Sequence, residues 1–271
     1  MVAMSRSIED NPIQPRRLTR AEARSVDGYV IETLGLPGLV LMENAGLNAA
    51  GAIMDLLKAE FVVDEDSARV SIVCGGGNNA GDGYVIARHL LAWGLSPTVY
   101  SLKPVEELDG DAAVNAKAWL KLGQGVEDLS KPGAVGEASE RWRQSHVVVD
   151  AVLGTGFSDD KAPMRPGVAA VVRAISELRQ APESAEGGGF LGRIVAVDVP
   201  SGLDCDTGRP AGGEAGAAVR ADLTITFMAE KAGFAAAGAG RYVGRVVVAD
   251  IGVPEAVVEA AIDRGGRPDC G

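Results

Sequence analysis

The stretch VSIVCGGGNNAGDGYVIAR (Val70–Arg88) changes from an apolar run to three glycines and then to a pattern typical of a helix. Strand–loop–helix units of this kind often bind phosphate, because the backbone N–H groups at the start of the helix attract an anion. Gly76 and Gly81 have the spacing of a P-loop, but Asp82 and Gly83 stand where that motif has lysine and a hydroxyl residue. The stretch therefore predicts a ligand-binding loop that differs from a P-loop.

A second phosphate motif fits only in part. Gly75, Gly77 and Ala80 satisfy the glycine fingerprint of dinucleotide-binding folds. In such folds an acidic residue at the end of the next strand holds the ribose, whereas here Ser101 and Lys103 occupy that region. An ordinary nicotinamide-dependent dehydrogenase is therefore disfavoured.

Short apolar runs rich in β-branched residues recur from this stretch onward. They are VSIVC at Val70, TVYSL at Thr98, HVVVDAVL at His146, IVAVDV at Ile194, LTITF at Leu223 and VVVADI at Val246. Runs that are apolar at nearly every position indicate strands buried on both faces. Because helical patterns separate the early runs, the chain is expected to adopt an α/β fold with a mostly parallel, doubly wound sheet.

The N-terminal part precedes the sheet. Thr19 and Glu22 form a capping-box pattern that predicts a helix, and a second helix is expected from Pro37. Residues 1–17 contain no apolar run of signal-peptide length and are expected to form a flexible tail. We expect residues 18–271 to form a single domain.

Composition and charge exclude several classes of partner. The formal charge of -11, from 37 acidic and 26 basic side chains, repels polyanions, so nucleic acid is not expected as the main partner. No run approaches the roughly 18 apolar residues needed to span a membrane. Cys74, Cys205 and Cys270 lack the spacing of a disulfide framework or a zinc site, which favours a reducing, cytoplasmic compartment.

Polar residues follow four of the predicted strands. The clusters are GGGNNAGDG after Cys74, DAVLGTGF from Asp150, DVPSGLD from Asp198 and MAEKAG after Phe227. In open α/β sheets, ligands bind outside the carboxyl ends of the strands. The clusters therefore predict one site at one edge of the sheet.

Within the first cluster, Asp82 has two interpretations. It either caps the following helix, where a negative charge meets the positive end of the helix dipole, or binds a ligand. The consecutive Asn78 and Asn79, placed after three glycines and against a buried strand, indicate a loop shaped for a ligand.

The later clusters offer oxygen atoms for a cation. Asp150 lies near the end of an apolar strand, where either a backbone hydrogen bond or a cation must compensate its charge. Asp150 and Asp198, with oxygen donors from Asn79 and Ser201, would suit a hard cation rather than zinc or copper.

Other polar residues are assigned more modest roles. Asp204 and Asp206 are expected to face solvent in their loop. Lys231 either neutralises a carboxylate or a phosphate, or is simply solvated. His89 and His146 lie in no motif, so nucleophilic catalysis that depends on histidine has little support.

At these residues the chain resembles a known family. The blocks that carry the resemblance are LMENAG at Leu41, VCGGGNNAGDGYVIARHL at Val73, DAVLGTGF at Asp150, AVDVPSGLDCDTG at Ala196 and ADLTITFMAEKAG at Ala221. In content and order they are similar to the NAD(P)H-hydrate epimerases, the YjeF N-terminal-domain family. Linked motifs that extend from about Thr19 to Val253 are far more specific than a glycine fingerprint alone.

The resemblance implies a Rossmann-like, three-layer αβα sandwich and an isomerase that interconverts the R and S forms of NADHX and NADPHX. These are nicotinamide cofactors to which water has added at C6 of the dihydronicotinamide ring, so the implied function is cofactor repair. It also implies a homodimer, with one potassium ion per subunit and NAD(P)HX as substrate. The kinase-like domain of many bacterial members has no counterpart here, so a separate NAD(P)HX dehydratase is expected as metabolic partner.

The resemblance also implies which residues form the site. The positions that match substrate contacts are Asn78, Asn79, Ala80, Gly81, Asp82, Gly154, Thr155, Gly156, Phe157, Ser158, Asp159, Asp160 and Asp198. The positions that match potassium ligands are Asn79, Asp150 and Ser201. The usual family loop is NNGGD, so Ala80 departs from it and would be strained if that position required a positive φ.

Asp198 is expected to act as a general acid/base beside the C6 hydroxyl, helping it leave and return on the opposite face. The lone pair of the ring nitrogen would assist departure and give an iminium-like species that nearby carboxylates stabilise. Ring opening and reclosure is an alternative route. The rival function is a non-catalytic nucleotide- or protein-binding scaffold, which would be expected to lose the cation and substrate residues.

Overall fold

The buried apolar runs form one sheet. The computed structural model describes residues 16–61, 67–158, 163–180, 190–212 and 217–265. Its seven-stranded sheet has the order β4-β3-β2-β5-β6-β7-β9, and all neighbouring strands are parallel. The strands are β2 (Val70–Cys74), β3 (Thr98–Ser101), β4 (Glu127–Asp128), β5 (Val147–Ala151), β6 (Arg193–Val197), β7 (Leu223–Phe227) and β9 (Arg245–Ala249). All six predicted strands are confirmed.

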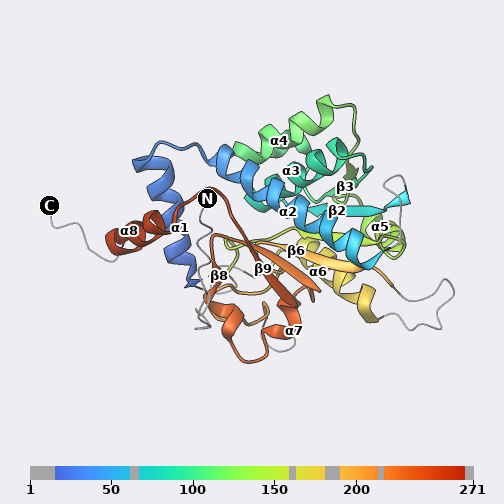
Figure 1. Cartoon of the computed structure of the whole chain (residues 1–271). Helices are drawn as coiled ribbons and strands as arrows, with labels where there is room; N and C mark the ends of the chain where they lie inside the picture. The colour runs from blue at the N-terminus through green and yellow to red at the C-terminus, as the bar shows by residue number, and fades with distance from the viewer. Residues whose placement is uncertain (1–15, 62–66, 159–162, 181–189, 213–216, 266–271) are drawn as a thin grey trace, which may run out of the picture.

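Helices cover both faces of this sheet (Figure 1). The helices α2 (Gly38–Glu60), α3 (Asn78–Ala92) and α4 (Gly110–Lys121) pack side by side on one face, and α5 (Ala134–Trp142) and α6 (Pro166–Glu177) pack together on the other. Strand residues alternate between the two cores, since Ile72 joins the first and Val73 the second. The three-layer αβα sandwich is therefore confirmed. None of the helices in the described ranges is long and apolar enough to cross a membrane.

The elements that sequence patterning missed are short or only partly buried. The edge strand β4 is two residues long and has no apolar run. Helix α5 buries only Ala138 and Trp142, and the short α7 (Gly240–Val243) precedes β9. Helix α8 (Glu255–Gly265) packs against α1 (Arg20–Gly28), far from the helices that cover the sheet (Figure 1).

The order of the strands creates a switch point between β2 and β5. From β2 the chain moves to β3 and β4 on one side, then returns to β5 on the other side of β2. The loops that follow β2 and β5 therefore diverge from adjacent strand ends, which is where ligands bind in doubly wound sheets. The two loops pass so closely that a Cβ on Gly75 would lie 2.0 Å from the Val152 carbonyl oxygen. Only glycine fits at this crossing.

The N-terminal segment is attached to the far end of the sheet. Strand β1 (Arg17–Leu18) pairs in parallel with β8 (Glu230–Lys231), the strand that follows β7. The predicted capping box is confirmed, since Glu22 N–H donates to Thr19 Oγ1 at 3.2 Å and Thr19 N–H to Glu22 Oε2 at 2.7 Å. A π-helical turn, η1 (Tyr29–Thr33), continues α1, and α2 follows Pro37 as predicted. Of the expected tail, residues 1–15 lie outside the described residues, whereas Arg17 is part of β1.

Close packing of α2 on α3 gives a first prediction. A Cβ on Gly46 of α2 would lie 2.4 Å from Val85 Cβ and Cγ1, and both are buried. We expect Gly46→Ala to lower the free energy of unfolding by about 1–3 kcal/mol, because overpacking forces the helices apart. Gly51→Ala, in the same helix with no atom within 4 Å of the added Cβ, is the control and should be neutral or stabilising by up to ~1 kcal/mol. Urea unfolding measures both, and equal effects would contradict the packing argument.

Candidate active site

Asp198 is the centre of the site. It follows β6, is only 8% exposed, and adopts a left-handed backbone with φ 64°, which among non-glycine residues Asp and Asn tolerate best. Its Oδ2 accepts hydrogen bonds from the Thr155 N–H at 2.7 Å and from the Thr155 hydroxyl, and its Oδ1 lies 3.0 Å from Lys231 Nζ. Burial alone raises the pKa of Asp198, but Lys231 and Thr155 outweigh it and hold the pKa below 3.8. Asp198 is therefore ionised at neutral pH.

Lys231 is the counter-charge of Asp198. It is 2% exposed, and its ammonium also donates to Thr226 Oγ1 at 2.8 Å and to the Phe227 carbonyl at 3.2 Å. Of the two interpretations of Lys231, neutralisation of a carboxylate is confirmed and the solvated lysine is wrong. Lys231 lies in a two-residue strand between β7 and a 3-10 turn. Such short elements have no periodic pattern, so the sequence did not show that Lys231 is buried.

Asp82 differs from Asp198 in its electrostatic state. It lies five residues into α3, whose N-cap is Gly77, so the interpretation of Asp82 as a helix cap is wrong. Within the described residues its carboxylate has no hydrogen-bond or ion-pair partner. Burial, then Asp198, then Asp27 raise the pKa of Asp82 well above 3.8. The site thus contains one carboxyl group that favours its proton and one that does not.

Asp27 is a further acidic group that the sequence did not reveal. Asp27 lies on α1 and is exposed to solvent. No sequence motif surrounds it. Burial by surrounding protein atoms and the charge of Asp198 raise the pKa of Asp27 to about 6, although Lys231 opposes the shift. Asp27 is thus exposed on one side and close enough to Asp198 to feel its charge, which fits a position at the edge of the site. Only the folded arrangement of α1 brings it there.

The loop at the start of α3 is ordered without strain. Asn78 is its exposed first residue, and Ala80 lies in the helix. Among described non-glycine residues only Asp198 and Met228 have positive φ, so Ala80 requires no unusual backbone. Gly81 is buried beneath Met42, whose Sδ would lie 2.5 Å from an added Cβ. In the structure Gly81 therefore serves close helix packing.

Asn79, Asp150 and Ser201 lie together around the Leu153 peptide. Asn79 Nδ2 donates to the Leu153 carbonyl at 2.9 Å, and the Leu153 N–H donates to Ser201 Oγ at 2.8 Å. The Ser201 hydroxyl donates to Asp150 Oδ1 at 2.6 Å, and the Ser201 N–H donates to Asp150 Oδ2 at 2.8 Å. The predicted backbone hydrogen bond to Asp150 is therefore present.

These hydrogen bonds only partly offset the burial of the Asp150 charge, and they leave Asn79 Oδ1 without a donor from the residues that the structure describes. Asp150 is 0% exposed and has no ion pair among the described residues, and burial raises its pKa to about 6. Asn79 Oδ1 is buried and accepts no hydrogen bond in the described part of the chain. A buried carboxylate, an unpaired amide oxygen and a hydroxyl grouped around one peptide are oxygen atoms of the kind that a hard cation prefers. The described residues contain no cluster of three or more His, Cys, Asp or Glu side chains that could hold a metal ion.

The loop after β5 approaches Asp198 directly. A Cβ on Gly154 would lie 2.7 Å from Asp198 Oδ2, so glycine is required there. Gly156 is exposed, whereas Ser158 is 7% exposed. Asp159 and Asp160, also implied as substrate contacts, lie outside the described residues.

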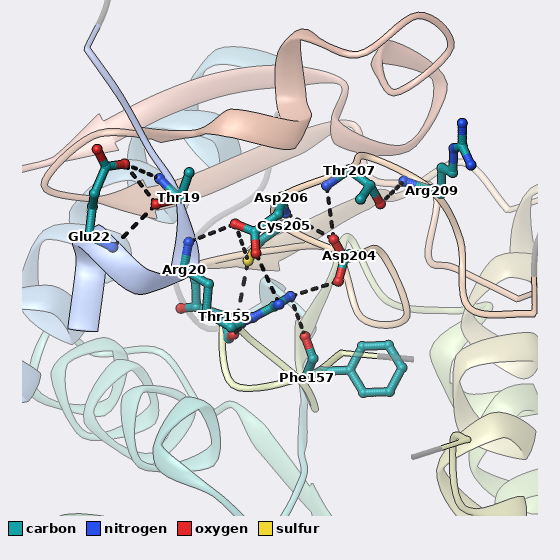
Figure 2. Close-up of polar contacts among 10 residues, drawn as sticks. All are labelled: Thr19, Arg20, Glu22, Thr155, Phe157, Asp204, Cys205, Asp206, Thr207 and Arg209. Carbon is teal, nitrogen blue, oxygen red and sulfur yellow. Dashed lines mark hydrogen bonds and ion pairs between the residues drawn. The ribbon is translucent and has the colours of Figure 1, made fainter. Parts of the chain in front are cut away.

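Arg20 of α1 binds the backbone of this loop (Figure 2). Its side chain donates to the carbonyls of Thr155 and Phe157, each at 2.8 Å. It also forms ion pairs with Asp204 at 2.7 Å and Asp206 at 3.0 Å. The expectation that Asp204 faces solvent is wrong, because it is 8% exposed, and Asp206 is only partly exposed. Arg20 was missed, since a single arginine after an N-cap carries no sequence signal.

Comparisons with known proteins show what the chain resembles. The model of the family described as YjeF-related protein N-terminus matches residues 38–233. An NAD(P)H-hydrate epimerase of Rhodopirellula baltica is 38% identical over 88% of this chain and 84% of its own length. One of Pirellula staleyi is 38% identical over 89% and 94%. A bifunctional NAD(P)H-hydrate repair enzyme Nnr of Moorella thermoacetica is 34% identical, and the match covers 41% of it. The crystal structure of yeast ynu0 has the same fold, with TM-score 0.71, 20% identity and coverage of 94% and 96%.

Proposed function

The chain belongs to the YjeF-related protein N-terminus family, and from that membership we propose that it is an isomerase that interconverts the R and S forms of NAD(P)HX in cofactor repair. The observation that carries this proposal is the 38% identity to NAD(P)H-hydrate epimerases along most of both chains. The site supports it, because Asn79, Asp82, Asp150 and Asp198 lie at the switch point where a dinucleotide would bind. A non-catalytic scaffold would not need buried carboxyl groups with opposed pKa shifts.

The opposed pKa shifts assign the two carboxyl groups different parts in the reaction. In the route through loss of the hydroxyl, the C6–oxygen bond breaks as the ring-nitrogen lone pair forms a C=N bond, and water then adds on the opposite face. Asp82, whose pKa burial and the Asp198 charge raise, is proposed to donate a proton to the departing hydroxyl and to take one back from the incoming water. Asp198, which is ionised, stabilises the cationic ring. Asp82 is therefore proposed for the proton transfer, and the general acid/base role predicted for Asp198 stays a prediction.

Binding of the phosphates is supported by the start of α3. Its N-cap, Gly77, provides no side-chain hydrogen bond, so the first N–H groups of the helix are available to an anion. Lys103 lies beside this loop, with its Cδ 3.0 Å from where a Cβ on Gly76 would be. The positive charge of a lysine at this place suits a phosphate. The acidic residue that binds the ribose in dehydrogenases would repel it.

Potassium fits the oxygen atoms around Leu153. Asn79 Oδ1, Asp150 and Ser201 Oγ would hold it, and the ion would compensate the buried Asp150 charge and fix the loop beside the site. One ion per subunit corresponds to one such group of ligands.

Cation binding should be visible as thermal stability. We expect KCl to raise the melting temperature more than choline chloride at equal ionic strength, because an ion that binds only the folded chain stabilises it. A gain of 1 kcal/mol corresponds to roughly 2–4 °C for a domain of this size. Asp150→Asn removes the only charged ligand and should abolish the difference between the two salts, as scanning fluorimetry would measure. Equal shifts in both salts with the native chain would rule out a specific site.

The function itself is tested by a coupled assay. The R epimer is supplied with a dehydratase specific for the S epimer, and consumption is compared with spontaneous epimerisation. Acceleration by this protein supports the proposal. The absence of acceleration, with and without potassium, overturns it and favours the scaffold. Oxidation of a hydroxy acid with NAD would instead identify a dehydrogenase.

We also propose a homodimer in the cytoplasm, acting before a separate NAD(P)HX dehydratase. The apolar side chains of Ile31, Leu34, Val40 and Leu47 are exposed along η1 and α2, and such a surface is suited to a second copy. Light scattering measures the oligomeric state.

A further inference from the structure

Arg20 makes more contacts than its position in α1 requires. Its backbone N–H and one ion pair, both to Asp206, link the helix N-terminus to the loop that carries Asp204 and Asp206. The remaining donors reach inward to the carbonyls of Thr155 and Phe157 and to the buried Asp204 (Figure 2). A guanidinium is the side chain whose planar fork can serve all these acceptors at once.

The next contact connects this group to the reacting end of the site. The same Thr155 whose carbonyl accepts from Arg20 uses its N–H and hydroxyl to hold Asp198 Oδ2. The opposite side of Asp198 is held by Lys231, whose strand pairs with β1 two residues before Arg20. The N-terminal segment therefore supports both partners of the Asp198 carboxylate.

We propose that Arg20 is a positioning residue of the active site, which fixes the loop 154–158 so that Thr155 orients the Asp198 carboxylate. The inference rests on the proposed epimerase function of this site. It adds a residue outside the stretch 38–233 that the family model matches. Arg20 does not touch the reacting atoms; it acts through Thr155.

A positioning role predicts a change in Asp198 as well as a loss of activity. In Arg20→Ala, kcat/KM per folded molecule should fall about 10–100-fold, because misplacement of a reacting group by about 1 Å has effects of this size. The pKa of Asp198 should rise, since the Thr155 hydrogen bonds help to hold it down. Guanidinium ion, added below the concentration that unfolds the protein, should restore part of the activity.

The experiment compares Arg20→Ala with Arg24→Ala. Arg24 lies one turn later on α1, is exposed, and forms no hydrogen bond or ion pair among the described residues. The pKa of the Asp198 carboxyl is followed by ¹³C NMR, and activity by the coupled assay. The double variant Arg20→Ala with Thr155→Val should lose less than the sum of the two single losses, because both changes act on one path.

Each outcome decides the proposal. A raised Asp198 pKa in Arg20→Ala but not in Arg24→Ala supports it, and an unchanged Asp198 pKa overturns it even if stability falls. If Arg20→Ala does not fold, Arg20→Lys and Asp206→Asn remove fewer contacts, and the same NMR criterion applies to them. An inactive native protein would overturn the proposed function alone, since the NMR result still decides the role of Arg20.

Discussion

Replacing Asp198 with asparagine is expected to lower kcat by about 10²–10³-fold while the protein remains folded. Asparagine has nearly the same shape and tolerates the left-handed backbone of φ 64°. It can still accept the Thr155 hydrogen bonds through its amide oxygen. What it removes is the negative charge that would stabilise a cationic ring. The loss should therefore appear in kcat more than in KM.

The coupled assay and a far-UV circular dichroism spectrum are measured on the same preparation. Asp55→Asn, an exposed position on α2, is the matched control and should retain native activity. Full epimerase activity in Asp198→Asn would eliminate the electrostatic role of Asp198 and leave Asp82 as the acidic group to be tested next.

Replacing Lys231 with methionine is expected to lower the free energy of unfolding by about 3–5 kcal/mol at pH 7, because it leaves a buried carboxylate without its counter-charge. The effect should depend on pH. With Lys231 present, the pKa of Asp198 is below 3.8, so the native pair is lost only in strong acid. Without Lys231, only the Thr155 hydrogen bonds oppose burial, so the pKa of Asp198 rises from its native value and acidification protonates Asp198 and relieves the penalty.

The difference in unfolding free energy between native protein and Lys231→Met should therefore shrink between pH 7 and pH 5. Urea titrations at the two pH values measure it. Lys117→Met, at an exposed position on α4, is the control and should stay within about 0.5 kcal/mol of the native protein. A difference that is independent of pH would mean that Lys231 contributes by packing rather than by its charge.

Where a local pattern determines structure, the sequence was sufficient. The buried runs such as Val147–Ala151 predicted the strands, because only a two-sided core requires apolar residues at every position. Glu127–Asp128 and Ala134–Trp142 escaped detection, since an edge strand and a helix with few buried residues show little periodicity. Their places in the fold are decided by neighbours that are distant along the chain.

The site follows the same distinction. Asn79, Asp150 and Asp198 were predicted as site residues because each lies at or just after the end of a strand, and these strand ends share one edge of the sheet. The pKa values of the acidic side chains were not predictable from the sequence. The pKa of Asp82, for example, depends on burial and on charges from other elements. Arg20 and Asp27 reach the site only through the tertiary packing of α1, which no local pattern encodes.

Because β1 pairs with β8, the site can be completed only after β8 has been synthesised. Arg17 contacts Glu230, 213 residues later in the chain, so these contacts are among the most non-local in the molecule. At ~5–20 residues per second, the ribosome would need roughly 10–40 s between making Arg20 and making Lys231. Within that interval the strands β2 to β5 can assemble, whereas Asp198 is made only 33 residues before its ammonium partner Lys231. A nascent chain would therefore be folded in its centre well before it could act on a cofactor.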